Sequence, residues 1–269
     1  MPEFDLHERR NWAGQAAAYA RSFAQLCAHP AGELLDMAGV GAATRLLDVG
    51  TGSGTVARLG RDRGAAVAAV DAEDSMVRAT AAEVPQADVR LGILPDLPFA
   101  GGVFDAVVAN FVINHVGDPR AAALEMRRVA APGGTVAVSI WPQPAGTAQS
   151  LWWQAIDDAG AVRPAAMPRV AAHLDFPRNA SGVTGLLASA GLSDIRCRTV
   201  EWVLRVEPRD WWSGPANGLG TAGHVIAAQT PEMVARIKAS FDRLSAPYLD
   251  GDGMLALPTA ALLAVGAAK

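Results

Sequence analysis

The stretch Leu46-Leu47-Asp48-Val49-Gly50-Thr51-Gly52-Ser53-Gly54-Thr55 decides the fold of this chain. Its mostly apolar start predicts a buried strand, and its three glycines predict a tight turn whose backbone a ligand can approach closely. A helix is expected next, over Ser53–Arg63, and a second strand ends at Asp71. Ligands of open α/β sheets bind beyond the carboxyl ends of the strands, which is where this turn lies. The stretch therefore predicts a ligand site at its glycines.

Strand and helix patterns alternate along much of the chain. Strands are expected over Arg45–Val49, Ala66–Asp71, Asp88–Gly92, Phe104–Asn110, Thr135–Trp141, Asp194–Val206 and Met254–Val265. Helices are expected over residues 10–28 (one or two helices), Ser53–Arg63, Ser75–Val84, Asp118–Ala131, around Trp152 and Trp153, Gly182–Ala190 and Pro231–Leu244. This order predicts a Rossmann-like α/β fold, a doubly wound, mostly parallel seven-stranded sheet with helices on both faces.

The alternation breaks after Trp141, where prolines and tryptophans become frequent. The simplest organisation is a single domain over residues 1–269 with a cofactor-binding core over about 40–141. N-terminal helices over 1–39 and insertions over about 142–180 and 207–250 are expected to form a helical cap over the substrate.

Composition narrows the class of protein. The 269 residues carry a net charge of −4 and are 51% hydrophobic, with no long basic run, which argues against a nucleic-acid partner. Two cysteines without zinc spacing predict no metal site. Because apolar runs are too short for a membrane span and the acidic start lacks the features of a signal peptide, we expect a cytoplasmic protein. A monomer and a homodimer both stay open.

The glycine spacing separates two kinds of nucleotide cofactor. Gly-x-Gly-x-Gly differs from the dinucleotide pattern Gly-x-Gly-x-x-Gly, which disfavours NAD and favours S-adenosylmethionine. The main-chain N–H groups of the turn and of the next helix suit an amino-acid carboxylate. Asp48 either orients the loop or accepts from the ammonium of the ligand. The Asp71 carboxylate suits two ribose hydroxyls; the alternative is a helix cap, a role that Asp74 could take instead.

A set of motifs carries a family resemblance. It comprises Leu46–Thr55, Asp71, Leu97-Pro98-Phe99, Phe104-Asp105, Asn114-His115-Val116, Arg128–Gly134 and the early Trp12-x-x-x-Ala16-x-x-Tyr19. These residues resemble the class I S-adenosylmethionine-dependent methyltransferases, and most of all the branch around the ubiquinone and menaquinone C-methyltransferases and their small-molecule relatives. The resemblance covers residues 10 to 141 and is weaker beyond them.

The resemblance implies positions for the cofactor. The methionine moiety would lie along Gly50, Thr51, Gly52, Ser53 and Gly54, and Asp71 would hold the ribose. Ala72 and Met76 would flank the adenine, with Ile93 and Leu94 at its edge. Asn110, with Phe111 and Val112 beside it, would face the transferable methyl group. The chain departs from the family at Ile93, where an acid is common, so adenine recognition must rest on backbone groups and packing or on another residue.

Several side chains are candidates for contact with the substrate. His115 is a possible general base, and packing is its alternative role. Tyr19 either closes over the cofactor and substrate or packs its helix onto the sheet. An aromatic wall and a place in the core are alternatives for Trp152, Trp153, Trp202, Trp211 and Trp212, with Trp211 and Trp212 favoured for the wall. His224 reaches the substrate or packs within the cap.

The sequence thus predicts methyl transfer from S-adenosylmethionine to oxygen or carbon of a small, hydrophobic or aromatic acceptor, such as a secondary metabolite or a quinone. Two alternatives are a non-catalytic S-adenosylmethionine-binding protein and a nicotinamide-dependent oxidoreductase.

Overall fold

A seven-stranded sheet organises the molecule. The computed structural model describes residues 3–164 and 167–269, so the predicted segments 1–39 and 142–180 each extend beyond it. The strand order is β3-β2-β1-β4-β5-β7-β6, and only β7 runs antiparallel to its neighbours. The strands are β1 (Arg45–Val49), β2 (Ala66–Asp71), β3 (Asp88–Leu91), β4 (Phe104–Asn110), β5 (Ala130–Ile140), β6 (Ser193–Val206) and β7 (Leu255–Ala267). The predicted fold class is confirmed.

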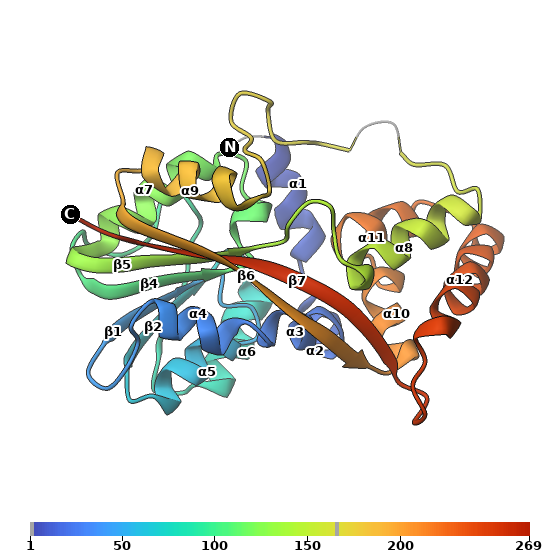
Figure 1. Ribbon diagram of the computed structural model, residues 1–269, viewed down its shortest axis with the longest axis horizontal. Helices are drawn as coiled ribbons and strands as arrows, with labels where there is room; N and C mark the ends of the chain where they lie inside the picture. The colour runs from blue at the N-terminus through green and yellow to red at the C-terminus, as the bar shows by residue number, and fades with distance from the viewer. Residues whose placement is uncertain (1–2, 165–166) are drawn as a thin grey trace.

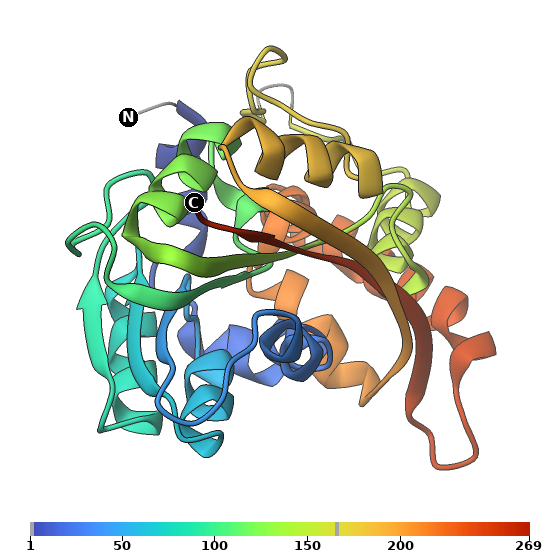
Figure 2. The same ribbon diagram turned by 60° about the vertical axis from the view of Figure 1, so that its left-hand side comes forward.

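Helices cover both faces of the sheet. On one face lie α4 (Ala31–Met37), α5 (Thr55–Asp62) and α6 (Asp74–Glu83), and on the other α7 (Pro119–Val129) and α9 (Ala180–Ser189) (Figures 1 and 2). Side chains of a strand alternate between these layers. Leu46 joins the buried cluster of the first face, whereas Leu47 and Val49 join that of the second.

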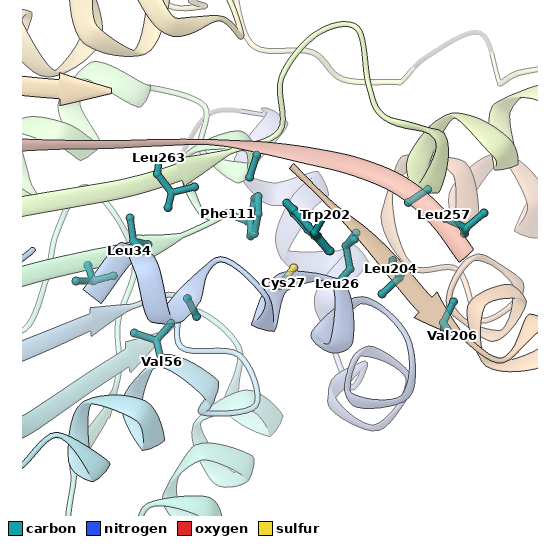
Figure 3. Close-up of a cluster of buried hydrophobic side chains, with 14 of the residues drawn as sticks. Leu26, Cys27, Leu34, Val56, Phe111, Trp202, Leu204, Val206, Leu257 and Leu263 are labelled. Atoms are coloured by element: carbon teal, nitrogen blue, oxygen red, sulfur yellow. The ribbon is translucent and has the colours of Figure 1, made fainter. Parts of the chain in front are cut away.

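A group of four helices forms a cap beyond the sheet. It consists of α8 (Thr147–Asp158), α10 (Pro208–Ala216), α11 (Gly220–Ala227) and α12 (Pro231–Ser245), at the far ends of β6 and β7 (Figure 1). Buried apolar side chains continue from the core toward this cap, from Leu34 and Val56 to Val206 and Leu257 (Figure 3). The cap is therefore joined to the core by a continuous apolar cluster.

The N-terminal region is divided more finely than expected. Where one or two helices were expected over residues 10–28, three are found, namely α1 (Glu3–Trp12), α2 (Ala16–Arg21) and α3 (Phe23–Ala28), and α4 lies within the N-terminal segment expected to be helical. Ser22 breaks the run: it is fully buried, and its hydroxyl donates to the carbonyl of Ala18 at 2.7 Å. Such a bond from a side chain to the backbone competes with helix continuation.

Other boundaries hold or shift by a few residues. Asp118 accepts from the N–H of Ala121 and caps α7, as predicted. The helix expected to end at Ala131 ends at Val129, and β5 begins at Ala130 rather than at Thr135. Residues 132–134 thus lie inside β5, where Gly133 donates to the carbonyl of Ala268 just after β7. Two 3-10 turns, Ile113–His115 and Ala246–Tyr248, complete the elements. Within the two described ranges, no helix is both long and apolar enough to cross a membrane.

Candidate active site

The glycine loop lies at the carboxyl end of β1. Its three glycines all have positive φ, of +67° at Gly50, +57° at Gly52 and +87° at Gly54. A Cβ on Gly50 would come within 2.4 Å of Val112, and one on Gly52 within 3.1 Å of the Tyr19 ring. The first two positions therefore require glycine both for their backbone and for their neighbours.

Asp48 lies beneath this loop. Its side chain is 1% exposed, and Oδ2 accepts from the hydroxyl of Thr51 at 2.6 Å and from the N–H of Ala57 at 3.1 Å. Of the two roles considered for Asp48, the geometry matches loop orientation. The side chains of Asp48 and Thr51 are buried beneath the loop, and Asp48, Thr51, Ser53 and Gly54 are not among the residues that line the cavity described below. Cofactor contact at these four positions stays a prediction.

Asp71 ends β2 beside the loop. Oδ2 accepts from the N–H of Gly52 at 2.8 Å, and Oδ1 accepts from the N–H of Glu73 at 3.0 Å. Burial raises the pKa of Asp71 to about 6, although these two hydrogen bonds act to lower it. The cap of α6 is neither Asp71 nor Asp74: Glu73 accepts from the N–H groups of Ser75 and Met76. Asp71 therefore keeps lone pairs for a ligand.

Beyond Asp71 the cavity wall is mostly apolar. Ala72, Met76, Ile93 and Leu94 all line it, at the positions expected around an adenine. Glu73 lines it too and also accepts from the N–H of Gly14 at 3.2 Å, which ties the N-terminal region to this wall.

The end of β4 forms the middle of the cavity. Asn110 lines it, but its amide is already bonded, donating to the carbonyl of Cys27 at 2.9 Å and accepting from the hydroxyl of Ser139 at 2.6 Å. Phe111 has a positive φ of +59° and stacks on Trp141, with ring centroids 3.6 Å apart. Such backbone strain in a non-glycine residue is typical of functional sites. Val112 follows on the wall of the cavity.

His115 lies next along the wall and has an acidic partner. Its Nδ1 is 2.7 Å from Oε2 of Glu8 on α1, and the indole N–H of Trp12 donates to the same oxygen at 3.3 Å. The side chain of His115 is 34% exposed, and that of Glu8 only 14%. Tyr19 lies close by, its ring 5.8 Å from that of Trp12.

These residues surround one cavity of about 810 Å³. The loop and the strand ends form one half of it. The other half, which we call the aromatic chamber, lies between the sheet and the cap and is lined by Phe23, Phe111, Trp141, Trp152 and Trp153. A cavity of this size, mostly apolar with a few polar groups, is typical of a small-molecule site.

Trp152 and Trp153 line this chamber, whereas the pair favoured as the substrate wall does not. Trp211 is fully buried and stacks behind Trp152 at 4.4 Å, and Trp212 packs on Phe241. His224 does not line the cavity either; its ring lies 5.1 Å from that of His7. Whether a side chain lines the cavity depends on which face of its cap helix is turned toward the cavity. That orientation follows from tertiary packing, which the sequence pattern alone does not show.

Comparison with known proteins assigns the family. A family model described as a methyltransferase domain matches residues 47–138. An uncharacterised protein of Mycobacterium bovis is 30% identical over 254 residues, which cover 90% of this chain and 88% of that protein. The chain belongs to the class I S-adenosylmethionine-dependent methyltransferases. This methyltransferase therefore uses S-adenosylmethionine as its methyl donor, and the oxidoreductase alternative is excluded.

The chain is also similar to a curated methyltransferase and to a solved structure. The demethylmenaquinone methyltransferase of Renibacterium salmoninarum is 29% identical over 175 residues, which cover 62% of this chain and 74% of that protein. The solved structure of the YcgJ protein from Bacillus subtilis is 17% identical, with a TM-score of 0.57 over 90% of this chain and 98% of that one. At that identity the structural likeness shows the fold alone.

The sequence did not point to Glu8, Glu73 or the chamber residue Trp141 as wall residues. One signal was present for Glu8, which lies four residues before Trp12 and so shares a helix face with it.

Burial of Asp48 predicts a pH-dependent stability. Burial raises the pKa of Asp48 to about 7, against hydrogen bonds from Thr51 and Ala57 that lower it. A raised pKa means that the folded protein holds this proton more tightly than the unfolded chain does. The resulting stabilisation is fully present at pH values below 3.8, the ordinary pKa of an aspartate, and is lost as the pH rises through about 7. We expect the free energy of unfolding to fall by on the order of 2 kcal/mol between pH 5 and 8.

Urea unfolding followed by tryptophan fluorescence checks this expectation. Asp48→Asn should flatten the pH dependence, because an amide imitates the protonated acid. The matched control is Asp62→Asn on α5, whose side chain is 61% exposed, and it should leave the dependence as it is. Equal slopes for the wild type and Asp48→Asn would contradict the assignment.

Proposed function

We propose that this methyltransferase transfers the methyl group to oxygen or carbon of a small, hydrophobic or aromatic metabolite, with a quinone-like molecule as one example. One observation carries the proposal: the glycine loop and the aromatic chamber belong to the same cavity. A donor held at the loop would thus present its methyl group toward an acceptor in the chamber.

The residues around the loop fit S-adenosylmethionine. The space above Gly50 and Gly52 is kept open by their lack of Cβ atoms, which suits close contact with the methionine moiety. Asp71 would accept from the ribose hydroxyls, and Ala72, Met76, Ile93 and Leu94 would enclose the adenine. The donor, when bound, supplies an electrophilic methyl group. The protein supplies alignment and keeps water away.

The chamber favours a flat, apolar acceptor. Aromatic side chains from α3, the end of β4, the end of β5 and α8 face this part of the cavity, and aromatic rings stack well on one another. The name of the Renibacterium relative, a demethylmenaquinone methyltransferase, is consistent with an acceptor of this kind.

A nucleic-acid acceptor is disfavoured by two features. The net charge is −4, whereas proteins that grip phosphates are basic. The sequence Asn110-Phe111-Val112-Ile113 also lacks the two prolines that enzymes acting on nucleobase amines commonly have after the asparagine.

Binding and turnover together test the proposal. Calorimetry should show binding of S-adenosylmethionine and of its demethylated product. Methyl transfer from labelled donor should then occur to members of a panel of phenols and hydroquinones, and not to oligonucleotides or peptides. The proposal fails if the folded protein binds neither compound, or if label passes only to the macromolecules.

The chamber itself can be tested with a pair of tryptophans. Trp153→Ala should raise KM for an aromatic acceptor about tenfold, since it removes one aromatic wall, and leave donor affinity within twofold. Trp212→Ala is the matched control: Trp212 is also half-buried in the cap but packs on Phe241, away from the cavity. Equal changes in KM for the two variants would contradict this placement of the acceptor.

A further inference from the structure

The imidazole of His115 is held by a carboxylate from the N-terminal helix. Glu8 lies on α1, 107 residues away in sequence, and its Oε2 is 2.7 Å from Nδ1 of His115. The indole N–H of Trp12 donates to the same oxygen, which holds the carboxylate in place. All three residues line the cavity.

We propose that Glu8 is a positioning residue that makes His115 the base for an acceptor carrying an acidic hydroxyl, as in a phenol or an enol. The inference rests on the proposed function, because it assigns the chemistry of the acceptor held in the chamber. A carboxylate can only accept, so Nδ1 of His115 carries a proton and the lone pair of the neutral ring is at Nε2.

The charge of Glu8 supports this role. Burial acts to raise its pKa, but the hydrogen bonds from His115 and Trp12, together with the attraction of the His115 and His7 rings in their protonated forms, outweigh burial, and the pKa of Glu8 is lowered. Glu8 is therefore a carboxylate at neutral pH. A fixed negative charge beside Nδ1 stabilises the imidazolium that forms once Nε2 takes a proton.

The transfer balances with these groups alone. The acceptor hydroxyl loses its proton to Nε2 of His115, and the electron pair of that bond stays on the acceptor. That pair forms the new bond to the methyl carbon, while the carbon–sulfur bond breaks with its pair left on sulfur. The positive charge of the sulfonium thus ends as an imidazolium, which returns its proton to solvent.

Tyr19 and Cys27 also line the cavity but are unsuited to this task. Burial, chiefly, raises the pKa of Tyr19 well above its ordinary value, so its hydroxyl stays neutral. Burial likewise raises the pKa of Cys27 to about 12. An acceptor that is already nucleophilic would need no such base, so a built histidine–carboxylate pair points to an acceptor that must lose a proton.

The tautomer of His115 gives a test that needs no acceptor. In protein labelled with 15N-histidine, the neutral ring of His115 should carry its proton on Nδ1, with the signal assigned by its loss in His115→Asn. Glu8→Leu should move the proton to Nε2 in most molecules. Glu8→Gln keeps an oxygen that can accept and should retain the Nδ1 proton. A wild-type proton on Nε2, or no change in Glu8→Leu, overturns the inference.

Turnover of a phenol from the panel gives the second readout. Glu8→Leu should lower kcat about 100-fold or more, in the range of general-base catalysis, and leave affinity for S-adenosylhomocysteine within twofold. Glu8→Gln should recover part of this loss. A loss of kcat below threefold in Glu8→Leu overturns the inference.

Asp5→Ala separates positioning of the ring from docking of α1. Asp5 also anchors α1, since it accepts from the N–H of Gly117, but it does not bond to His115. This variant should keep the Nδ1 proton on His115; a tautomer shift equal to that of Glu8→Leu would show that Glu8 acts only through the helix and would overturn the inference. Failure of the proposed function is distinguishable, because it removes cofactor binding or turnover and leaves the tautomer result unchanged.

Discussion

Replacing Asp71 by asparagine should weaken binding of S-adenosylhomocysteine about 100-fold or more. The carboxylate already accepts from the N–H groups of Gly52 and Glu73, and we assign its remaining lone pairs to the ribose. An asparagine has one acceptor oxygen and a donating NH₂, so one of these N–H groups would face another donor. Loss of charged hydrogen bonds costs about 1.5–3 kcal/mol each, and two such bonds exceed a 100-fold change.

Calorimetry with S-adenosylhomocysteine measures this loss directly. Asp74→Asn is the matched control, because Asp74 is an exposed acid three residues further on that pairs with Arg78. It should bind within twofold of the wild type. An Asp71→Asn protein that is folded and binds as the wild type does would remove Asp71 from the cofactor site.

The same residue predicts a pH dependence of cofactor affinity. Burial raises the pKa of Asp71 to about 6 in the protein without ligand. The protonated acid has one acceptor oxygen fewer, so affinity should fall as the pH drops from 8 through about 6. In Asp71→Asn the profile should lose this step. An affinity that is level from pH 8 to 5 in the wild type would contradict the assignment.

Gly50→Ala should also reduce cofactor affinity about 100-fold. The added Cβ would lie 2.4 Å from one methyl carbon of Val112, 3.1 Å from the other and 3.3 Å from its Cβ, and a β-branched side chain is stiff at χ1. The loop or the end of β4 must then shift by roughly 1 Å, and a misplacement of that size costs about 100-fold at a preorganised site.

Two further variants separate this clash from backbone strain. Gly39→Ala carries the same strain, with φ of +72°, but a Cβ there meets nothing within 4 Å. It should cost about 1 kcal/mol of stability and leave affinity within twofold. The double variant Gly50→Ala with Val112→Ala should regain at least tenfold in affinity. If the double variant binds no better than Gly50→Ala, the steric explanation is wrong.

Most of the core could be predicted from sequence. The bounds expected for the strands at Arg45–Val49, Ala66–Asp71 and Phe104–Asn110 match the structure, because each strand is an apolar run with clear turn residues around it. The errors have a local and a long-range cause. The helical segment expected over residues 10–28 is interrupted at Ser22, whose hydroxyl donates to the carbonyl of Ala18. Residues 130–134 join β5 because they pair with the end of β7 and with β4, which lie far away in sequence.

Within the site, the sequence left two roles open for several side chains. Asp48 could orient the loop or contact the ligand, and its side chain bonds to Thr51 beneath the loop. Trp211 and Trp212 could form a substrate wall or belong to the core, and they pack within the cap. A residue type in the right segment does not tell which way its side chain points, because direction follows from the packing of the whole element.

Local chemistry determined the donor side of this protein. The donor side rests on short segments, namely three glycines within five residues and an acid at the end of the next strand. In a parallel sheet the carboxyl ends of neighbouring strands lie at the same edge, so these segments place an open glycine turn beside a carboxylate. Only the tertiary structure decided the acceptor side. Glu8, Phe111, Trp141 and Trp153 meet there from α1, the end of β4, the end of β5 and α8, and bringing together residues over 100 positions apart depends on how those elements pack.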